Sequence, residues 1–433
     1  MKRLLPALLL STACGAGLVD HSGIDLQTVG GLQCTAPQQA CNNACVSTET
    51  DVNNCGGCVI VCARPSLATS TCIARSCGFT CNPGFFLCGA GQRCCPASAL
   101  AAGGDTSCAI VEGSVQCWGS NDSGQLGFSP TGALWSAKPV PLPGVSAAGA
   151  VAVGLKHACA ILAGTGEVMC WGANGSAQLG VALGNGPVKV PGISGALLLA
   201  LGDRHSCAAT STGLLCWGAN DVGQLGQGTI SATAVPGPVT GIVGATSISA
   251  GTAFTCAVTG SELYCWGTNS TYQFGESSPP QSSTPVLVNV PAPTAVAAGD
   301  AHACAIGSGS KLYCWGAGSS GQVGNGNTNP TSTPTGVLTC SLVSAGASHT
   351  CAVSGGAAFC WGANNFGQLG MSSPNPTKPF QVGTISAVQR IALGANHSCA
   401  QNADGAVYCW GNNGSGQAGA QAGGTLLSPR PID

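Results

Sequence analysis

The chain carries very little charge: of its 433 residues, 6 % are Asp, Glu, Lys or Arg. Long surface helices need these residues to solvate one face, so this deficit argues against a helical protein. The net charge is −2, and the one cluster of basic residues is Lys2-Arg3. Without a basic surface, nucleic acid is a poor candidate partner.

Aromatic residues are also scarce, at 5 % of the chain. After the N-terminus no stretch approaches the roughly 18 uninterrupted apolar residues of a membrane-spanning helix. The abundant residues are 67 glycines and 25 prolines, within a chain that is 44 % hydrophobic. Such a composition favours many short strands joined by tight turns, so we expect an all-β protein.

The chain contains 28 cysteines, most of them at recurring spacings that suit disulfides, which form outside a reducing cytosol. The N-terminus agrees with export, because Lys2-Arg3 is followed by an apolar run from Leu4 to Leu10. We therefore predict a signal segment over residues 1–14 and a linker over 15–33.

The residues Leu10-Ser11-Thr12-Ala13-Cys14 resemble a bacterial lipobox, with Ser11 where that motif has Leu. Two alternatives follow. In the first, Cys14 is acylated and the protein is a lipoprotein of the bacterial outer membrane or cell surface. In the second, cleavage near Gly15 or Ala16 releases a secreted protein.

Residues 34–95 form a predicted cysteine-rich module. About sixty residues cannot bury a large core, and disulfides are the common remedy. Its twelve cysteines allow six bridges of open connectivity. The motif Cys55-Gly-Gly-Cys58 could present thiolates to zinc, but no second pair follows at a fixed distance, so we favour bridging. The run from Cys45 to Cys58 resembles small Stig1-like modules, which implies no activity.

From residue 98 to 433 the chain repeats a unit seven times. Seven Cys-Trp-Gly triplets are separated by 53, 46, 49, 49, 46 and 49 residues, beginning at Cys117, Cys170, Cys216, Cys265, Cys314, Cys360 and Cys409. A period near 49 with four short strand patterns indicates propeller blades. We predict a seven-bladed β-propeller with a small disulfide-rich N-terminal domain.

A second cysteine precedes each triplet, at a spacing that suits one hairpin. If Cys108 faces Cys117 on antiparallel strands, Glu112-Gly113 is left as a two-residue turn. Directly opposed cysteines lie near disulfide range. We predict seven bridges within the blades: Cys108–Cys117, Cys159–Cys170, Cys207–Cys216, Cys256–Cys265, Cys304–Cys314, Cys351–Cys360 and Cys399–Cys409.

The signature Cys-Trp-Gly-x-Asn-x-x-Gly-Gln-Leu-Gly, complete at Cys117–Gly127 and Cys360–Gly370, resembles the RCC1-type repeat, whose members fold as seven-bladed propellers. The first unit begins at Ser98 without a preceding Pro-containing strand, whereas Ser428–Ile432 remains after the last signature. We therefore expect this C-terminal strand to complete blade one and close the ring.

Five histidines stand two residues before a hairpin cysteine: His157, His205, His302, His349 and His397. Adjacent blades keep equivalent atoms on the order of 10 Å apart, too far for shared zinc bonds near 2 Å. We expect each histidine to hydrogen-bond a neighbouring backbone group of its own blade.

Other recurring residues have structural interpretations. Strand alternation should place the seven tryptophans between blades. The Asn-rich turns, such as Ser120–Gly124, lack the spaced acids of a calcium loop and are typical turn sequences. Cys340 has no partner position in other units and is expected to be a buried, inert thiol.

No residue pattern supports catalysis, a metal site or a cofactor, so we predict a non-catalytic binding protein whose partner is a protein or a glycan at the cell surface. Loops such as Phe128–Ala137 and Ser277–Thr284 would form the recognition face. The alternative is a secreted inhibitor of an extracellular enzyme such as a β-lactamase, since one inhibitor has this type of propeller. That alternative requires a contiguous exposed aromatic patch.

Overall fold

The computed structural model describes residues 18–19, 25–29 and 32–432, apart from positions 43, 90, 130–131, 185, 278, 373 and 384. The predicted signal segment and Cys14 lie outside the described residues. The chain forms two compact units. One contains residues up to Asn82 together with Gly89–Cys94, and the other contains Pro83–Cys88 and the chain from Cys95 onward.

The first unit consists of short antiparallel strands and turns held together by disulfides. Five bridges lie within it: Cys34–Cys45, Cys41–Cys58, Cys55–Cys72, Cys62–Cys77 and Cys81–Cys94. Its strands are β1 (Leu18–Val19), β2 (Asp25–Val29), β3 (Leu32–Thr35), β4 (Gln38–Cys41), β5 (Ala44–Ser47), β6 (Ala68–Ile73) and β7 (Ser76–Cys81). Its buried cluster is made of cysteines rather than large aliphatic side chains. The prediction of a disulfide-rich N-terminal region is confirmed.

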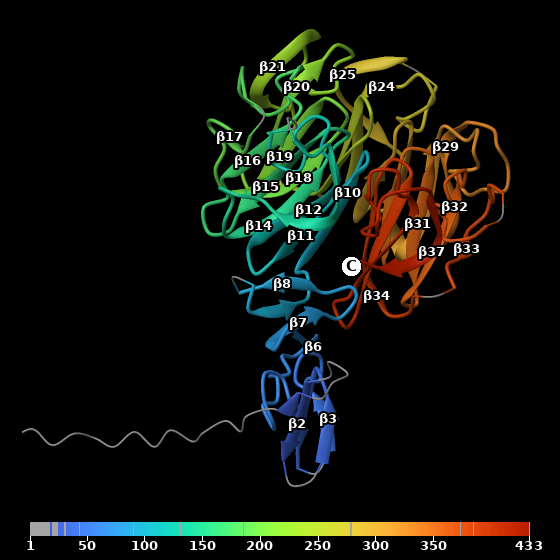
Figure 1. The fold of residues 1–433 in the computed structure, drawn as a ribbon. Coiled ribbons are helices and arrows are strands. Elements are labelled where there is room, and N and C mark those ends of the chain that lie inside the picture. The colour runs from blue at the N-terminus through green and yellow to red at the C-terminus, as the bar shows by residue number, and fades with distance from the viewer. Residues whose placement is uncertain are drawn as a thin grey trace, which may run out of the picture. The chain divides into compact units, whose positions relative to one another are not determined.

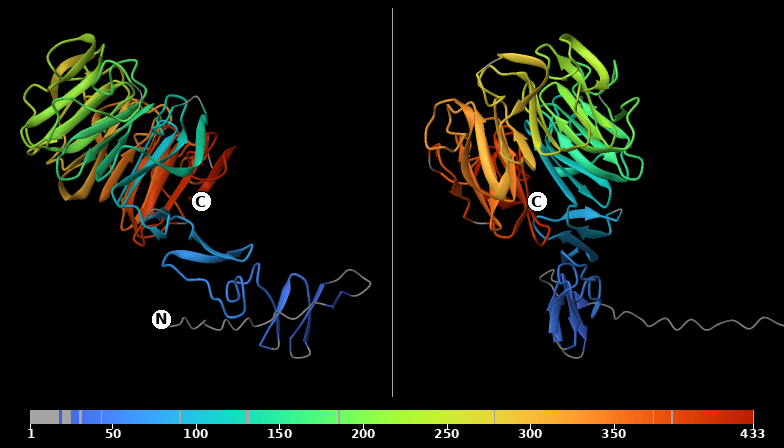
Figure 2. Two further views of the ribbon diagram at one scale, coloured as in Figure 1. Left: turned by 60° about the vertical axis from the view of Figure 1, so that its left-hand side comes forward. Right: turned by 180° about the vertical axis from the view of Figure 1, so that it is seen from behind.

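The second unit is a seven-bladed propeller, as predicted. Each blade is a four-stranded antiparallel sheet of consecutive strands, and Figures 1 and 2 show the sheets arranged radially. Blades 1 to 4 comprise β10 (Ala99–Gly103), β11 (Thr106–Val111), β12 (Ser114–Ser120), β13 (Trp135–Pro141); β14 (Ala148–Val153), β15 (His157–Leu162), β16 (Val168–Gly172), β17 (Val188–Lys189); β18 (Ala196–Leu201), β19 (His205–Thr210), β20 (Gly213–Asn220), β21 (Ser231–Pro238); β22 (Ala245–Ala250), β23 (Phe254–Thr259), β24 (Glu262–Thr268) and β25 (Gln281–Val288).

Blades 5 to 7 have the same order. They comprise β26 (Ala295–Ala298), β27 (His302–Ile306), β28 (Lys311–Gly316), β29 (Thr331–Thr339); β30 (Leu342–Ala345), β31 (His349–Ser354), β32 (Ala357–Gly362), β33 (Phe380–Gln381); β34 (Val388–Leu393), β35 (His397–Asn402), β36 (Val407–Asn412) and β37 (Thr425–Pro431). The one helical element among the described residues is the short turn η1 (Ser308–Ser310), and no described helix is long and apolar enough to cross a membrane.

The hairpin register follows the prediction. Cys108 pairs with Cys117 and Val111 with Ser114, which leaves Glu112-Gly113 as the turn. Both turn residues have positive φ, 51° and 77°, as a type I′ turn requires. The two cysteines of this hairpin are linked, with their Cα atoms 4.1 Å apart, and the other six blades repeat this arrangement.

The predicted closure of the ring is wrong. The C-terminal strand β37 pairs with β36 and completes blade 7, not blade 1. Blade 1 already has a fourth strand of its own, β13, which follows its Cys-Trp-Gly signature. The error came from the phase of the repeat: the Pro-containing strand pairs back with the signature before it rather than forward. Blades 1 and 7 are nevertheless neighbours, drawn in teal and red in Figure 1, and β10 packs beside β34.

Between blades, the core is built from one tryptophan and two side chains of the connecting segment. At the contact of blades 2 and 3, Trp217 packs with Val190 and Ile193. At the contact of blades 3 and 4 the equivalent side chains are Val239 and Ile242. Between blades 5 and 6 the second place is taken by Cys340, buried beside Trp361. Cys340 is therefore a small core residue, as predicted, and burial raises its thiol pKa to about 11.

At the contact between blades 7 and 1, the two apolar side chains come from separate segments of the chain. Ile432 supplies the first apolar side chain, and Phe86 from β8 (Phe86–Cys88) supplies the second. The ring of Phe86 lies 6.0 Å from that of Trp118. Gly84 exchanges backbone hydrogen bonds with Ile432 and Val407 of blade 7. The segment Pro83–Cys88 thus closes the propeller, and Cys88–Cys95 ties it to the start of blade 1.

Candidate functional site

One end of the propeller, called the loop face from here on, carries the long connections between third and fourth strands together with the short turns between first and second strands. In blade 1 the long connection is 121–134, and in blade 2 the short turn is 154–156. The opposite end carries the hairpin turns and the connections between blades. Both predicted recognition loops, Phe128–Ala137 and Ser277–Thr284, belong to the loop face.

The recurring Asn and Gln build these long loops from within. In blade 1 the Asn121 side chain accepts a hydrogen bond from the Leu126 backbone N–H at 3.0 Å and donates to two backbone carbonyls. The Gln125 side-chain oxygen accepts from the Ser123 backbone N–H at 2.8 Å. The same Asn contact recurs at Asn220. These side chains satisfy backbone groups of the loop, which agrees with the interpretation as turn residues rather than calcium ligands.

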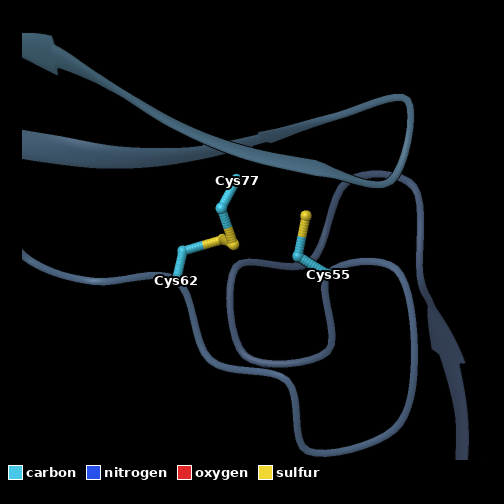
Figure 3. Close-up of side chains that lie close together, drawn as sticks. All are labelled: Cys55, Cys62 and Cys77. Carbon is cyan, nitrogen blue, oxygen red and sulfur yellow. A yellow bond between two sulfur atoms is a disulfide. The ribbon is translucent and has the colours of Figure 1, made fainter.

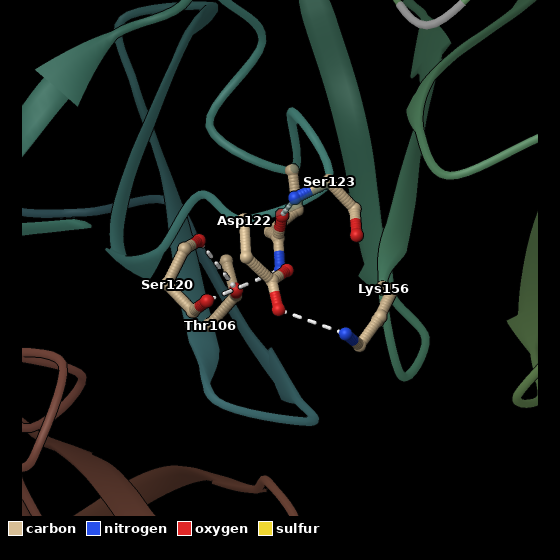
Figure 4. Close-up of polar contacts among 6 residues, drawn as sticks. Thr106, Ser120, Asp122, Ser123 and Lys156 are labelled. Atoms are coloured by element: carbon tan, nitrogen blue, oxygen red, sulfur yellow. Dashed lines mark hydrogen bonds and ion pairs between the residues drawn. The ribbon is translucent and has the colours of Figure 1, made fainter. Parts of the chain in front are cut away.

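Two ion pairs connect the loops of this face to the short turns beside them. Lys156 of blade 2 bonds Asp122 of blade 1 at 2.8 Å, as Figure 4 shows. Nearby, the Thr106 hydroxyl donates to the Ser120 carbonyl within blade 1. Arg204 bonds Asp221 in blade 3 at 3.0 Å. Both pairs are exposed, so each contributes little to stability, but they neutralise the two acidic side chains involved.

Large apolar side chains are exposed on the loop face. Trp135, at the start of β13, is 47 % exposed, and its neighbour Leu134 is 57 % exposed. Trp135 pairs with Ser120, whereas the equivalent outer-strand positions in blades 4 and 7 hold Gln281 and Thr425. Further exposed side chains on this face are Leu155, Leu183, Ile230 and Phe366. Exposed tryptophan is typical of binding surfaces, because one ring supplies much contact area.

The exposed aromatic residues of this unit lie on blades that are not adjacent. Trp135 belongs to blade 1, whereas Phe366 and Phe380 belong to blade 6, so blade 7 lies between them. Among the described residues, the exposed aromatic side chains therefore do not form the contiguous patch that the inhibitor alternative requires.

The propeller encloses a central cavity of about 290 Å³, lined by the first strand of every blade and the turn that follows it. At the loop face its mouth includes Asp203 and Asp300. Burial raises the pKa of Asp203 to about 6, assisted by the nearby negative charge of Asp300, while Thr252 and Arg204 oppose the rise. Burial also raises the pKa of Asp300.

The five recurring histidines bridge neighbouring blades instead of bonding to the backbone of their own blade, so that prediction is wrong. The Nε2 atom of His157 in blade 2 lies 2.9 Å from the Ser206 hydroxyl of blade 3. Because Ser206 donates its hydrogen to the Gln178 carbonyl of blade 2, the imidazole must be the donor to Ser206. The same chain of bonds starts at His205, His302, His349 and His397.

These pairs resemble a nucleophile beside a base, but their position excludes that chemistry. His157 and Ser206 are fully buried, as are the members of the other four pairs. Burial, joined at His157 by the neighbouring His205, lowers the pKa of that imidazole to about 3. A group that no substrate can reach and that stays neutral is a structural link. We call each His–hydroxyl–carbonyl chain an interblade link.

The tryptophans lie between blades, as predicted, and contribute to the same contacts. The indole N–H of Trp217 donates to the Gln178 carbonyl at 2.8 Å, so that carbonyl accepts two hydrogen bonds from the next blade. Six of the seven triplet tryptophans make this bond to the preceding blade. Trp118, beside Phe86, is the exception: its Nε1 has no hydrogen-bond partner in the described structure.

The pairing of histidine with hydroxyl was present in the sequence but was missed. Where a unit has His, the next unit has Ser or Thr directly before its first hairpin cysteine. Where a unit has Thr106 or Phe254 instead, the next unit has Ala158 or Ala303. This correlation between consecutive units would have indicated links across blades. The closing role of Phe86 has no such repeat, because it occurs once.

The sulfur atoms of Cys55, Cys62 and Cys77 lie within 4.8 Å of one another in the first unit. Figure 3 shows the Cys62–Cys77 bridge with the sulfur of Cys55 beside it. Cys55 is itself bridged to Cys72, and Cys58 to Cys41. Zinc requires free thiolates, which these disulfides do not offer, so the CxxC motif here supplies two separate bridges.

The blade architecture, the Cys-Trp-Gly signature and its loop-building Asn and Gln define the class of protein as a disulfide-bonded propeller of RCC1-type repeats. The family comparison agrees: the RCC1-like domain matches residues 187–433, and the Regulator of chromosome condensation (RCC1) repeat matches 112–161 and 150–178. The chain belongs to the RCC1-like family.

Solved structures with the same fold share little sequence. Prp20p from Saccharomyces cerevisiae, studied for binding to Gsp1p and histones, is 19 % identical, with a TM-score of 0.67 over 78 % of this chain and 87 % of that chain. Human WBSCR16 is 20 % identical, with a TM-score of 0.66 over 74 % and 94 %. At this identity the likeness shows the fold alone. The comparison with curated proteins gave no match.

Proposed function

We propose that this protein is an exported, non-catalytic binding protein that recognises a protein or glycan partner through the loop face of its propeller. The single observation that carries the proposal is Trp135, a large side chain left half exposed on a face built from loops of irregular length. A membrane-tethered form through Cys14 and a released form both fit this role. The disulfide content supports maturation in an oxidising compartment.

The non-catalytic part of the proposal is supported by where the reactive residue types lie. The His–Ser and His–Thr pairs are buried interblade links, and the Cys340 thiol is buried with a raised pKa. The solved relative Prp20 has been crystallised bound to Kap60, so a protein of this fold has a protein partner.

Site-specific photocrosslinking tests the recognition face. A benzophenone amino acid replaces Leu134 on the loop face or, as the matched control, Val243 in the connection at the opposite end, since both side chains are similarly exposed, at 57 % and 62 %. We expect crosslinks to cell-surface material of the native host from position 134 and not from 243, and loss of these crosslinks in Trp135→Ala. Equal crosslinking from both positions would contradict the proposal.

A separate measurement tests export and anchoring. Intact mass and non-reducing peptide mapping on native protein should show either a diacylglyceryl group on Cys14 or a start near Gly15, together with the seven hairpin bridges. An unprocessed N-terminus in the purified protein would contradict export.

A further inference from the structure

Two loops of the first unit are joined at their bases by a pair of disulfides. The loop 56–61 lies between Cys55 and Cys62, and the turn of the β6–β7 hairpin lies between Cys72 and Cys77, which are opposed in register. The bridges Cys55–Cys72 and Cys62–Cys77 connect each end of the loop to one strand of the hairpin. Figure 3 shows this base, where the sulfur atoms of the two bridges lie close together. The loop and the turn are therefore held side by side.

Together the two loops carry a group of exposed aliphatic side chains, called the aliphatic tip below. The loops are in close contact, because a Cβ atom added to Gly56 would lie 2.8 Å from the carbonyl oxygen of Arg75. All the exposed large hydrophobic side chains described in this unit belong to them, each between 52 % and 71 % exposed: Val59, Ile60, Val61 and Ile73. Exposed apolar side chains gathered in one place are typical of an interaction surface.

Hydrogen bonds hold the longer loop in one shape. The Val59 N–H donates to the Asn54 side-chain oxygen at 2.9 Å, and the Ile60 carbonyl accepts from the Cys55 N–H at 2.9 Å. Val59 has a φ of 62°, a conformation that β-branched residues rarely adopt. Glycine or asparagine would fit this backbone with less strain, so the presence of valine favours a role for its apolar side chain.

The basic residues beside the aliphatic tip have no acidic partner. From Cys55 to Asn82 the chain contains Arg64 and Arg75 and no Asp or Glu. Both arginines are exposed, and none of the ion pairs between described residues includes either of them. The acidic residue nearest in sequence, Asp51, accepts two hydrogen bonds within its own turn. Apolar side chains bordered by arginine complement a membrane surface that contains anionic lipids.

The small extent of the aliphatic tip favours a membrane over a protein partner. A stable protein–protein interface takes about 20 to 30 residues from each side. The loop 56–61 and the turn 73–76 contain six and four residues. A lipid surface is fluid and closes around short apolar projections, so a few aliphatic side chains and neighbouring positive charges are enough for reversible binding.

We propose that the aliphatic tip inserts into the interfacial region of an anionic lipid bilayer. Its four aliphatic side chains lie among the upper acyl chains, and the two arginines lie beside the lipid phosphates. The contact is reversible and needs no acyl group on Cys14. This inference goes beyond the proposed function, because it gives the first unit a binding surface that is separate from the loop face of the propeller.

Vesicle flotation tests the inference with the purified full chain that begins at Gly15, which carries no acyl group. Vesicles of phosphatidylcholine and phosphatidylglycerol in equal parts are compared with vesicles of phosphatidylcholine alone. We expect the chain to bind the anionic vesicles at least tenfold more tightly than the neutral ones. The double variant Arg64→Gln, Arg75→Gln should lose most of this preference, because the arginines supply the attraction to anionic lipid.

A second double variant tests the aliphatic side chains. Val59→Asn with Ile73→Ser removes two of them, and asparagine suits the positive φ of position 59, so binding to the anionic vesicles should fall at least tenfold. The matched control is Val235→Ser with Val243→Ser, which removes two propeller valines that are 75 % and 62 % exposed and should leave binding unchanged. Non-reducing peptide mapping checks that the disulfides of the first unit form in each variant.

The inference is overturned by a lack of flotation with both kinds of vesicle, by full binding in the Val59 and Ile73 variant, or by an equal loss in the control. Sedimentation that shows a dimer of the native chain, lost in this variant and without vesicle binding, would assign the aliphatic tip to contact with a second copy instead. Crosslinks from position 134 should persist in the variant, so failure of this inference is distinguishable from failure of the proposed recognition face.

Discussion

Two equivalent interblade contacts are built from different residues: the contact between blades 7 and 1, and the contact between blades 2 and 3. Between blades 2 and 3, Trp217 has its hydrogen bond and both apolar side chains come from the connecting segment. Between blades 7 and 1, the tryptophan N–H has no partner and Phe86 is brought from outside the repeat. The repeat therefore specifies six contacts by itself, and the seventh depends on a segment that precedes it.

Among the changes considered, loss of Phe86 should lower the free energy of unfolding the most. Phe86→Ala removes a buried ring beside Trp118 and should lower the free energy of unfolding by about 3 to 5 kcal/mol. Chemical denaturation measures it, with Phe366→Ala, a partly exposed residue of blade 6, as the control. A cost no greater than that of the control would show that the ring closes without the segment.

Acid should destabilise the propeller through its buried histidines. Their folded pKa values lie at about 3 to 4, below the ordinary value of 6.5, so the unfolded chain binds more protons. Their contribution is complete above about pH 6.5 and is lost as pH falls toward 4, at about 1.4 kcal/mol for each unit of pKa difference. Urea denaturation across this range measures the loss; a flat profile would contradict it.

At the contact between blades 4 and 5, Phe254 and Ala303 take the places of the histidine and the hydroxyl. This natural replacement suggests a variant that tests one interblade link at a time. The double variant His205→Phe, Thr255→Ala places the same Phe and Ala pair at the contact between blades 3 and 4. It should make the stability less sensitive to acid while changing the free energy of unfolding little at pH 7. Thr255→Ala alone leaves the buried His205 N–H without its acceptor and should cost about 1 to 3 kcal/mol. If the single and double variants are equally stable, histidine and hydroxyl are not coupled.

A smaller difference in the free energy of unfolding is expected from the tryptophan hydrogen bond, which the contact between blades 7 and 1 lacks. Trp410→Phe removes a bond to the Gln368 carbonyl, whereas Trp118→Phe removes none. Both changes lose similar ring volume, so Trp410→Phe should cost about 1 kcal/mol more. Thermal or chemical unfolding of both variants measures the difference, and equal costs would contradict the assigned role of the N–H.

The smallest effect is expected at Cys340. Cys340→Val places there the kind of side chain that other connecting segments already carry, and should change stability by less than about 1.5 kcal/mol. In the native protein this thiol should resist iodoacetamide until the chain unfolds, because it is buried and its pKa is raised to about 11. Rapid labelling of the folded protein would contradict its place in the core.

The sequence was sufficient for the features that repeat. Seven copies of Cys-Trp-Gly predicted the blades, and the spacing of Cys108 and Cys117 predicted the strand register, because antiparallel pairing leaves one turn length for each spacing. The phase of the repeat was ambiguous, since a strand between two signatures can pair with either one. The exposure of Trp135 could not be predicted, because this tryptophan lies outside the seven Cys-Trp-Gly triplets and has no counterpart in the other repeats. Asp203 and Asp300 line the same cavity mouth only because of the circular arrangement of the blades.

The interblade links also restrict how such a ring can grow or be rearranged. A unit that begins its second strand with His157 must be followed by one with a hydroxyl, and the unit after Phe254 carries alanine. The residues of each unit therefore complement those of the next unit. A duplicated or transplanted blade fits only where it matches the residues of the blades on both sides. Rotating the start of the chain around the ring preserves every match, whereas shuffling the units does not.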